Sequence, residues 1–153
     1  MSFNPNVRPS DRVQVLASLS PASDSAGSVT SGWLDASQFE QFLAVIQSGT
    51  LGASATIDAN IQQAQDGSGT NAKAIGSGKA FTQWTTSPSK ANKCALINMR
   101  AEEMDSNNGF SFIQLTVTIG VAASEASALL LGFDPKYEVT QSSSSPASVD
   151  QVI

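Results

Sequence analysis

Phe112-Ile-Gln-Leu-Thr-Val-Thr-Ile119 is the stretch that decides the fold, because its apolar and polar side chains alternate strictly from Ile113 onward. One side of this stretch carries Ile113, Leu115, Val117 and Ile119. Gln114, Thr116 and Thr118 fall on the other side. A period of two residues is typical of a strand with one buried face, so we predict a strand over Phe110–Ile119.

The segment Ala55-Thr-Ile-Asp-Ala-Asn-Ile-Gln-Gln63 repeats the same pattern earlier in the chain. We predict a second half-buried strand there, with four residues facing inward: Ala55, Ile57, Ala59 and Ile61. Shorter apolar runs predict further strands at Arg12–Leu19, Val29–Asp35, Lys79–Thr85, Lys93–Arg100 and Ala126–Phe133. In the first of these runs we expect the inward residues to be Val13, Val15, Ala17 and Leu19.

Turn-forming residues separate the predicted strands. The separators are Asp66-Gly-Ser-Gly69, Gly76-Ser-Gly78, Thr86-Ser-Pro-Ser89 and Ser106-Asn-Asn-Gly109. Seven or eight short strands with frequent turns and at most one helix indicate an all-β protein, an antiparallel β-sandwich or jelly roll of about eight strands.

The segment Ser37–Gln47 supports two interpretations. Ser37-Gln-Phe-Glu40 has the form of a helix capping box, and Phe39, Phe42, Leu43 and Ile46 follow a helical spacing. The same segment is rich in Phe, Val and Ile and lies between two predicted strands, which favours a strand buried on both faces. The local pattern by itself does not choose between helix and strand.

The composition excludes several classes of protein. The 153 residues include no histidine and one cysteine, which removes histidine-dependent catalysis, histidine-ligated zinc and an intrachain disulfide. Charged residues make up 14% and the net charge is -5, so the chain lacks the basic clusters that bind nucleic acid. The sequence has no apolar run long enough for a membrane span and no signal peptide, so we expect assembly in a cytoplasm.

Both ends of the sequence have the composition of arms. Residues 1–11 contain Pro5 and Pro9, and residues 140–153 contain the run Ser142–Ser145. We expect an N-terminal arm over 1–11, a sandwich over 12–139 and a flexible tail over 140–153. The arms are either disordered or ordered against a neighbouring subunit, and the aliphatic residues near the end keep the second alternative open.

Four local features are candidates for functional sites. Glu102-Glu103-Met104-Asp105 is expected to be a solvated turn with Arg100 as a local partner, the alternative being a weak cation site. Asp66–Lys73 is expected to be a hairpin or surface loop, because it lacks the ending of a phosphate-binding loop. Trp84 is the best candidate for an exposed or interfacial ring, whereas Cys94 is expected to be an inert core residue. The other tryptophan and most phenylalanines occupy strand positions typical of a core.

Several segments resemble the jelly-roll head decoration, or cement, proteins of tailed bacteriophages. The resemblance is carried by Ser31-Gly-Trp-Leu-Asp35, Phe39–Gly49, Ala55–Gly67, Phe112–Thr118 and Ala128-Leu-Leu-Leu-Gly-Phe-Asp-Pro-Lys-Tyr137. It covers about residues 29 to 138 and implies that Phe39–Gln47 is a strand. It departs from the family in Gln65-Asp66, where an acidic pair is usual, and in the serine-rich tail.

The resemblance implies a virion protein that binds the outer surface of the major capsid protein lattice, as a trimer at capsid threefold positions. From the composition we expect no enzyme activity, no cofactor, no metal site, and neither a nucleic-acid nor a membrane partner. The candidate partner contacts are Phe3, Val7, Arg8, Trp84, Tyr137, Val149, Val152 and Ile153. The alternatives are a carbohydrate-binding or host-attachment module and another connector or tail component on the same sandwich.

Overall fold

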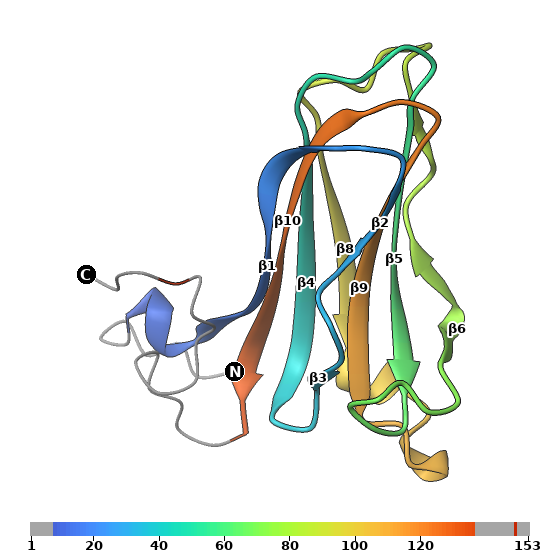
Figure 1. Cartoon of the computed structure of the whole chain (residues 1–153). Helices are drawn as coiled ribbons and strands as arrows, with labels where there is room; N and C mark the ends of the chain where they lie inside the picture. Colours follow the sequence, from blue (N-terminus) through green and yellow to red (C-terminus); the bar gives the residue numbers. More distant parts are fainter. Residues whose placement is uncertain (1–7, 137–148, 150–153) are drawn as a thin grey trace.

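Two antiparallel sheets make up the computed structural model, which describes residues 8–136 and 149 (Figure 1). Sheet A contains, in spatial order, β1 (Val13–Asp24), β10 (Ser124–Pro135), β4 (Phe39–Ser48) and β8 (Cys94–Arg100). Sheet B contains, in spatial order, β2 (Gly27–Thr30), β9 (Phe112–Gly120), β5 (Thr56–Ala64) and β6 (Lys73–Ala80). Two short strands complete sheet B: β3 (Leu34–Asp35) pairs with β9, and β7 (Trp84–Thr85) pairs with β5.

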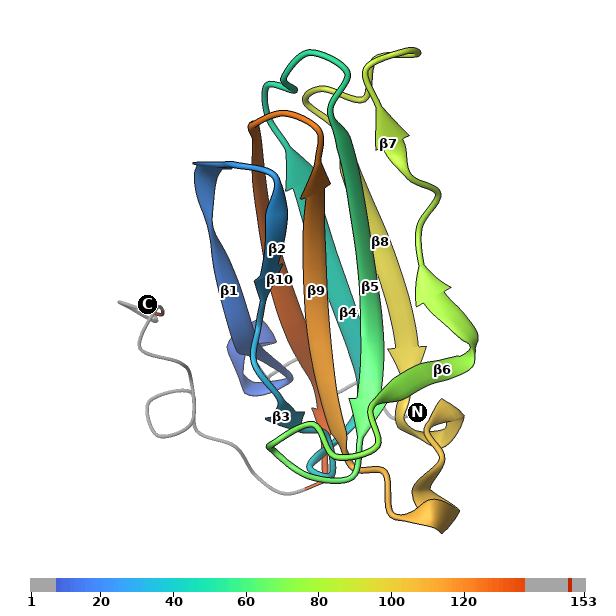
Figure 2. The same ribbon diagram turned by 45° about the vertical axis from the view of Figure 1, so that its right-hand side comes forward.

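The strand order is that of a jelly roll. Because β2 and β3 both pair with β9, and β6 and β7 both pair with β5, the ten strands occupy eight positions. Numbered by position, sheet A has the order 1-8-3-6 and sheet B the order 2-7-4-5, as in two interleaved Greek keys. The predicted fold class is confirmed, and the two sheets face each other as layers in Figure 2.

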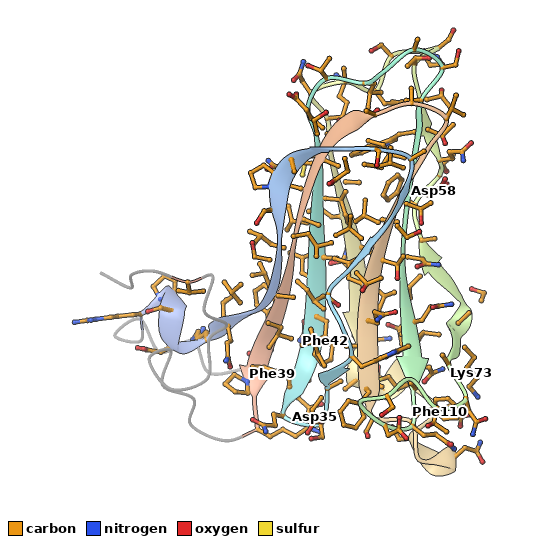
Figure 3. The ribbon with its side chains drawn as sticks, in the orientation of Figure 1. Asp35, Phe39, Phe42, Asp58, Lys73 and Phe110 are labelled. Atoms are coloured by element: carbon orange, nitrogen blue, oxygen red, sulfur yellow. The ribbon has the colours of Figure 1, made fainter. Side chains whose placement is uncertain are left out.

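The core lies between the two sheets and comes from the inward side chains of both. In β5 and β9 the predicted inward residues are all buried, which confirms the alternation found in the sequence. From sheet A, β4 contributes Phe42, Ala44 and Ile46, and the rings of Phe39 and Phe42 meet edge to face (Figure 3). The contested segment is therefore a strand, β4, hydrogen-bonded on one side to β10 and on the other to β8.

Two of the predicted strands are interrupted. The predicted strand Val29–Asp35 is divided into β2 and β3, and Gly32 between them has a φ of 72°, which a continuous strand does not accommodate. The predicted strand Lys79–Thr85 is divided between β6 and β7. Gly76 and Gly78, expected to separate strands, lie inside β6, where the pairing with β5 shifts register.

A bulge in β1 reverses part of the predicted inward face. The pairing with β10 shifts between Val15 and Ala17, so Val15 lies opposite the half-buried Leu131 and Ala17 lies opposite the buried Leu130. Ala17 faces the core as predicted, whereas Val13 and Val15 face outward. An extra residue in one strand moves every side chain beyond it to the other face, and this prediction was wrong for that reason.

Three 3-10 turns complete the described chain: η1 (Pro9–Asp11), η2 (Ala101–Glu103) and η3 (Ser106–Asn108). The backbone N–H of Arg8 donates to the Asp11 carboxylate at 3.1 Å and closes η1 just before β1. The expected arms fall mostly outside the described residues, so the boundaries at residues 12 and 139 stay predictions.

Candidate interaction faces

The outer face of sheet A is apolar at its centre. We call apolar face the six outward side chains Val15, Leu43, Val45, Leu96, Leu129 and Leu131. Strand register places Leu96, Val45 and Leu129 in one row across the sheet. Leu43, Leu131 and Val15 form the next row, in which Asn98 of β8 is the polar neighbour. None of the six belongs to the core between the sheets.

Solvent reaches this face in the described part of the chain. Leu96 is 58% exposed and Leu129 is 40% exposed, and the other four side chains are half-buried by their neighbours. Single exposed apolar residues are ordinary on a protein surface, but two adjoining apolar rows over four strands form a contiguous patch. Such a patch is typical of a surface that contacts another protein.

The two ends of the apolar face differ. Toward the start of β4 the next row contains the polar Arg100 and Gln41 and the half-buried Phe133 and Val13. At the opposite end, an open groove of about 530 Å³ is lined by residues that include Gln47, Cys94, Glu125 and Ser127. The outer face of sheet A thus runs from a mixed edge through an apolar centre to a polar groove.

The outer face of sheet B has a different chemistry, dominated by amide and hydroxyl groups. We call amide–hydroxyl face the outward side chains of β2, β5 and β9: Ser28, Thr30, Thr56, Asp58, Asn60, Gln62, Gln114, Thr116 and Thr118. Two contacts cross it: Ser28 Oγ lies 2.8 Å from Thr118 Oγ1, and Gln83 Nε2 donates to Asp58 Oδ2 at 2.7 Å. Asp58 is the single ionisable member, so a partner can dehydrate this face with little cost in buried charge.

The acidic cluster Glu102–Asp105 is divided among separate cations. The carboxylate of Glu103 lies 2.6 Å from Lys79 Nζ, and that of Glu102 lies 2.8 Å from the Arg100 guanidinium, the local partner predicted from the sequence. The hydrogen bond from Lys79, followed by that from the Arg100 backbone, lowers the pKa of Glu103. Across the described residues no group of three or more acidic or cysteine side chains is placed to hold a metal ion.

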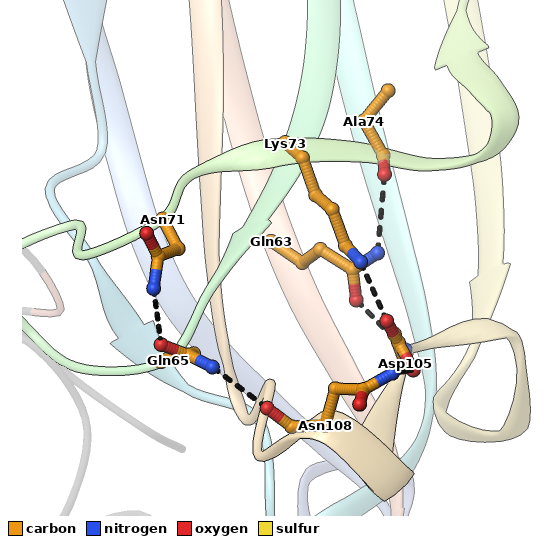
Figure 4. A network of polar contacts seen from close by, with 7 residues as sticks. All are labelled: Gln63, Gln65, Asn71, Lys73, Ala74, Asp105 and Asn108. Carbon is orange, nitrogen blue, oxygen red and sulfur yellow. Dashed lines mark hydrogen bonds and ion pairs between the residues drawn. The ribbon is translucent and has the colours of Figure 1, made fainter.

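A buried glutamine fixes the end of this cluster. Gln63, 2% exposed at the end of β5, accepts a hydrogen bond from the Asp105 backbone N–H at 2.9 Å and donates to the Ala74 carbonyl at 3.1 Å (Figure 4). Lys73 Nζ lies 2.5 Å from the Asp105 carboxylate and 4.1 Å from the ring centroid of Phe110. The hydrogen bond from Lys73, and then that from the Asn108 side chain, lowers the pKa of Asp105. These contacts join β5, β6 and the β8–β9 connection, so the Asp105 carboxylate has a structural role.

The neighbouring contacts are also structural. Asn71 donates to Gln65, and Gln65 donates to the Asn108 carbonyl at 2.7 Å, which ties the β5–β6 loop to η3 (Figure 4). In that loop the Asp66 carboxylate accepts hydrogen bonds from the Thr70 hydroxyl and from backbone N–H groups, which lower its pKa. The loop from Asp66 to Lys73 is therefore the surface hairpin connection predicted from the sequence.

Two predicted environments are reversed. Trp84, expected to be exposed or interfacial, is 7% exposed and packs on Phe81 with ring centroids 4.7 Å apart. It lies opposite Ile57 in the β5–β7 pairing, which turns it toward the core. Cys94, expected in the core, is exposed, because Ile97 and Met99 take the inward positions of β8 and Cys94 shares the outward side with Leu96.

The remaining candidate contacts are not brought together by the described structure. Arg8 is exposed before η1, and Val149 is half-buried. Phe3, Val7, Tyr137, Val152 and Ile153 lie outside the described residues. The apolar face was not among the predicted sites. Its signal was present in the apolar residues on both sides of β4 and in the Leu129–Leu131 run, but only strand register shows that they adjoin.

Two further classes of site, an exposed aromatic platform for carbohydrate and a membrane-spanning helix, receive no support within residues 8–136. Each tryptophan and phenylalanine there is buried or half-buried, so the exposed aromatic platform that the carbohydrate-binding alternative needs is not formed by them. Phe133 is an exception to the core positions expected of most phenylalanines, because it is half-buried on the outer side of sheet A. In the same region no helix has the length and apolar character needed to cross a bilayer.

Comparisons with known proteins give fold-level similarity alone. No family model and no curated protein matches the chain. One similar structure, the infectious bursal disease virus VP2 subviral particle, has 16% identity and a TM-score of 0.42 over 87% of this chain and 36% of that chain. The Triatoma virus structure has 10% identity and a TM-score of 0.47, over 90% of this chain and 72% of that chain.

The similar structures also include an enzyme. An acetyl xylan esterase from the rumen bacterium Butyrivibrio proteoclasticus has 7% identity and a TM-score of 0.35, over 88% of this chain and 32% of that chain. This chain spans about a third of the VP2 chain. At these identities and TM-scores, the jelly-roll assignment rests on the strand order of the chain itself.

Proposed function

We propose that this chain is a non-enzymatic structural protein of a tailed-phage virion that binds the outer surface of the major capsid protein lattice and stabilises it. Two observations support the proposal. Several segments of the sequence resemble decoration proteins, and both outer faces of the jelly roll suit contact with other proteins. In the family that the segments resemble, such proteins act as trimers on an assembled capsid, and the proposal places this chain in the virion in the same way.

The amide–hydroxyl face is the observation that carries the capsid contact. About a quarter of all residues in an ordinary domain are charged, whereas the outward positions of β2, β5 and β9 include Asp58 as their one ionisable residue. Hydroxyl and amide groups exchange hydrogen bonds with water for hydrogen bonds with a partner, and no unpaired ion is buried. The capsid contact would combine this face with the terminal residues predicted from the sequence: Phe3, Val7, Arg8, Tyr137, Val149, Val152 and Ile153.

Co-sedimentation with bare capsids tests this function. The purified chain is mixed with capsids of the same phage that lack it, and bound protein is measured in the pellet over a concentration series. We expect saturable binding that Thr116→Arg, at the centre of the amide–hydroxyl face, weakens at least tenfold. Asn107→Arg, which adds the same charge at an exposed position of η3, is the matched control and should bind as the wild type does. Absence of saturable binding by the wild-type chain refutes the proposed function.

The terminal contacts are tested in the same assay. Chains lacking residues 1–7 or 140–153 should bind capsids more weakly while their thermal unfolding changes little, because β1 begins at Val13 and β10 ends at Pro135. Unchanged affinity after removal of both ends would assign the whole contact to the sandwich.

A further inference from the structure

The connection between β9 and β10 carries the most exposed large apolar side chain in the described part of the chain. This side chain belongs to Val121, which is 71% exposed. The backbone N–H of Ala122 donates to the Gly120 carbonyl at 2.9 Å and closes a three-residue γ-turn around Val121. A single exposed apolar residue is ordinary on a protein surface, so a contact is indicated only if other properties of the turn point to one.

The backbone at Val121 is strained. Its φ of 71° lies in the left-handed region, which glycine and asparagine occupy readily and a β-branched residue rarely does. A γ-turn with a positive central φ is also the rare and strained form of that turn. The valine side chain thus lowers the stability of the folded chain, and it adds nothing to the core between the sheets. Strain of this kind concentrates at sites that hold a ligand or a partner.

Hydrogen bonds to the β4–β5 connection hold the strained turn in place. The buried Ser124 hydroxyl accepts from the Gly52 N–H at 3.0 Å and donates to the Ala122 carbonyl at 3.3 Å. The backbone N–H of Glu125 donates to the Thr50 carbonyl, and the N–H of Thr50 donates to the Glu125 carboxylate, each at 2.9 Å. The two connections lie together at one end of the sandwich (Figure 2), so the exposed valine is presented on a fixed support.

The turn continues the amide–hydroxyl face. Gly120, the last outward position of β9, pairs with Thr56, and Val121 follows it directly. Neither connection, Gly49–Ala55 or Val121–Ala123, contains an ionisable residue. The face therefore ends in an apolar side chain among uncharged groups, the combination of apolar centre and polar surround that is typical of a protein–protein contact.

A rigid apolar knob suits a preformed pocket in another protein. Little conformational entropy is lost when a side chain on a fixed turn is buried, which favours a partner whose own surface is already shaped. A fluid bilayer offers no shaped pocket, and one valine buries too little apolar area to hold a protein on a membrane. The groove of about 530 Å³ at the same end of this chain includes Lys93 and Glu125 in its lining, so it does not offer a second copy an apolar pocket.

We propose that Val121 is the apolar anchor of the capsid contact and inserts into an apolar pocket on the outer surface of the capsid lattice. The inference rests on the proposed function, and it adds an anchoring residue and the chemistry of the pocket that receives it. Aliphatic or aromatic side chains would line this pocket, and uncharged hydrogen-bonding groups beside it would meet the amide–hydroxyl face. Burial of Val121 in the complex would offset the strain that the free chain carries.

Capsid co-sedimentation of two variants at Val121 tests the anchor. Val121→Gly removes the side chain and relieves the strained φ, so its Tm should equal or exceed that of the wild type while its capsid Kd rises at least tenfold. Val121→Asn should weaken binding similarly, because asparagine tolerates the same φ but is polar. Ser54→Gly is the matched control: Ser54 is exposed in the neighbouring connection with a φ of 57°, so glycine relaxes the backbone there without removing an apolar group. The capsid Kd of this control should equal that of the wild type.

The outcomes separate this inference from the proposed function. Saturable binding by the wild type together with wild-type affinity in either Val121 variant overturns the anchor and leaves the proposed function standing. Equal weakening by Ser54→Gly also overturns the anchor, because the effect would then come from loop flexibility. Two other results would assign Val121 to a different partner: sedimentation with phosphatidylcholine vesicles that Val121→Asn abolishes, or an oligomer of the free chain that Val121→Asn dissociates. Absence of saturable binding by the wild type refutes both proposals.

Discussion

Replacing Gln63 with leucine should destabilise the sandwich although the side-chain volume hardly changes. Gln63 is fully buried, and its amide hydrogen-bonds two backbone groups, the Asp105 N–H and the Ala74 carbonyl. Leaving a buried polar group unpaired costs about 1–3 kcal/mol. Ala74 is exposed and its carbonyl can turn to water, whereas Asp105 is half-buried, so we expect the loss to be about 2–3 kcal/mol in total.

Urea unfolding followed by tryptophan fluorescence measures this loss. In a domain of this size each kcal/mol corresponds to about 3 °C in Tm, so thermal unfolding should fall by roughly 6–9 °C. Gln62→Leu is the matched control, because Gln62 is the adjacent residue on the outer, half-exposed side of β5 and should change stability by under about 0.5 kcal/mol. Equal unfolding midpoints for the two variants would refute the role assigned to Gln63.

Three other predictions follow from contacts in the described chain. Lys79 holds the pKa of Glu103 below its ordinary value of 4.5, so this pair stabilises the fold above that pH, and the stabilisation is lost as pH falls through the lowered pKa. In thermal unfolding, the Tm of Glu103→Gln should therefore decline less steeply with acid pH than the Tm of the wild type. Trp84→Ala should cost about 3–5 kcal/mol in a denaturant titration, since it removes a buried ring, and the folded variant should bind capsids like the wild type. The exposed Cys94 thiol should react with a thiol reagent without prior unfolding, and a rate no faster than global unfolding would contradict its position.

The sequence alone determined the class of fold and the inner faces of its central strands. Strict alternation in Ala55–Gln62 and Ile113–Ile119 has one physical solution, an extended chain with one buried side, and both strands have the predicted inward residues. The absence of histidine and the scattering of the carboxylates along the chain likewise limited the possible catalytic and metal-binding chemistry. Both are properties of the sequence and not of the fold. In the acidic cluster the sequence predicted the pairing of Glu102 with Arg100, whereas it did not predict the pairing of Glu103 and Asp105 with lysines of β6.

Only the tertiary structure decided which surfaces face outward and what they adjoin. Phe39–Ile46 fits a helix by its local spacing, and its strand form follows from hydrogen bonding to β10 and β8, which lie far from it in sequence. The bulge after Val15 and the inward turn of Trp84 likewise depend on pairing partners, because a strand residue takes the face of the residue opposite it. The apolar face exists for the same reason: its members come from four separate strands, and register alone places them side by side.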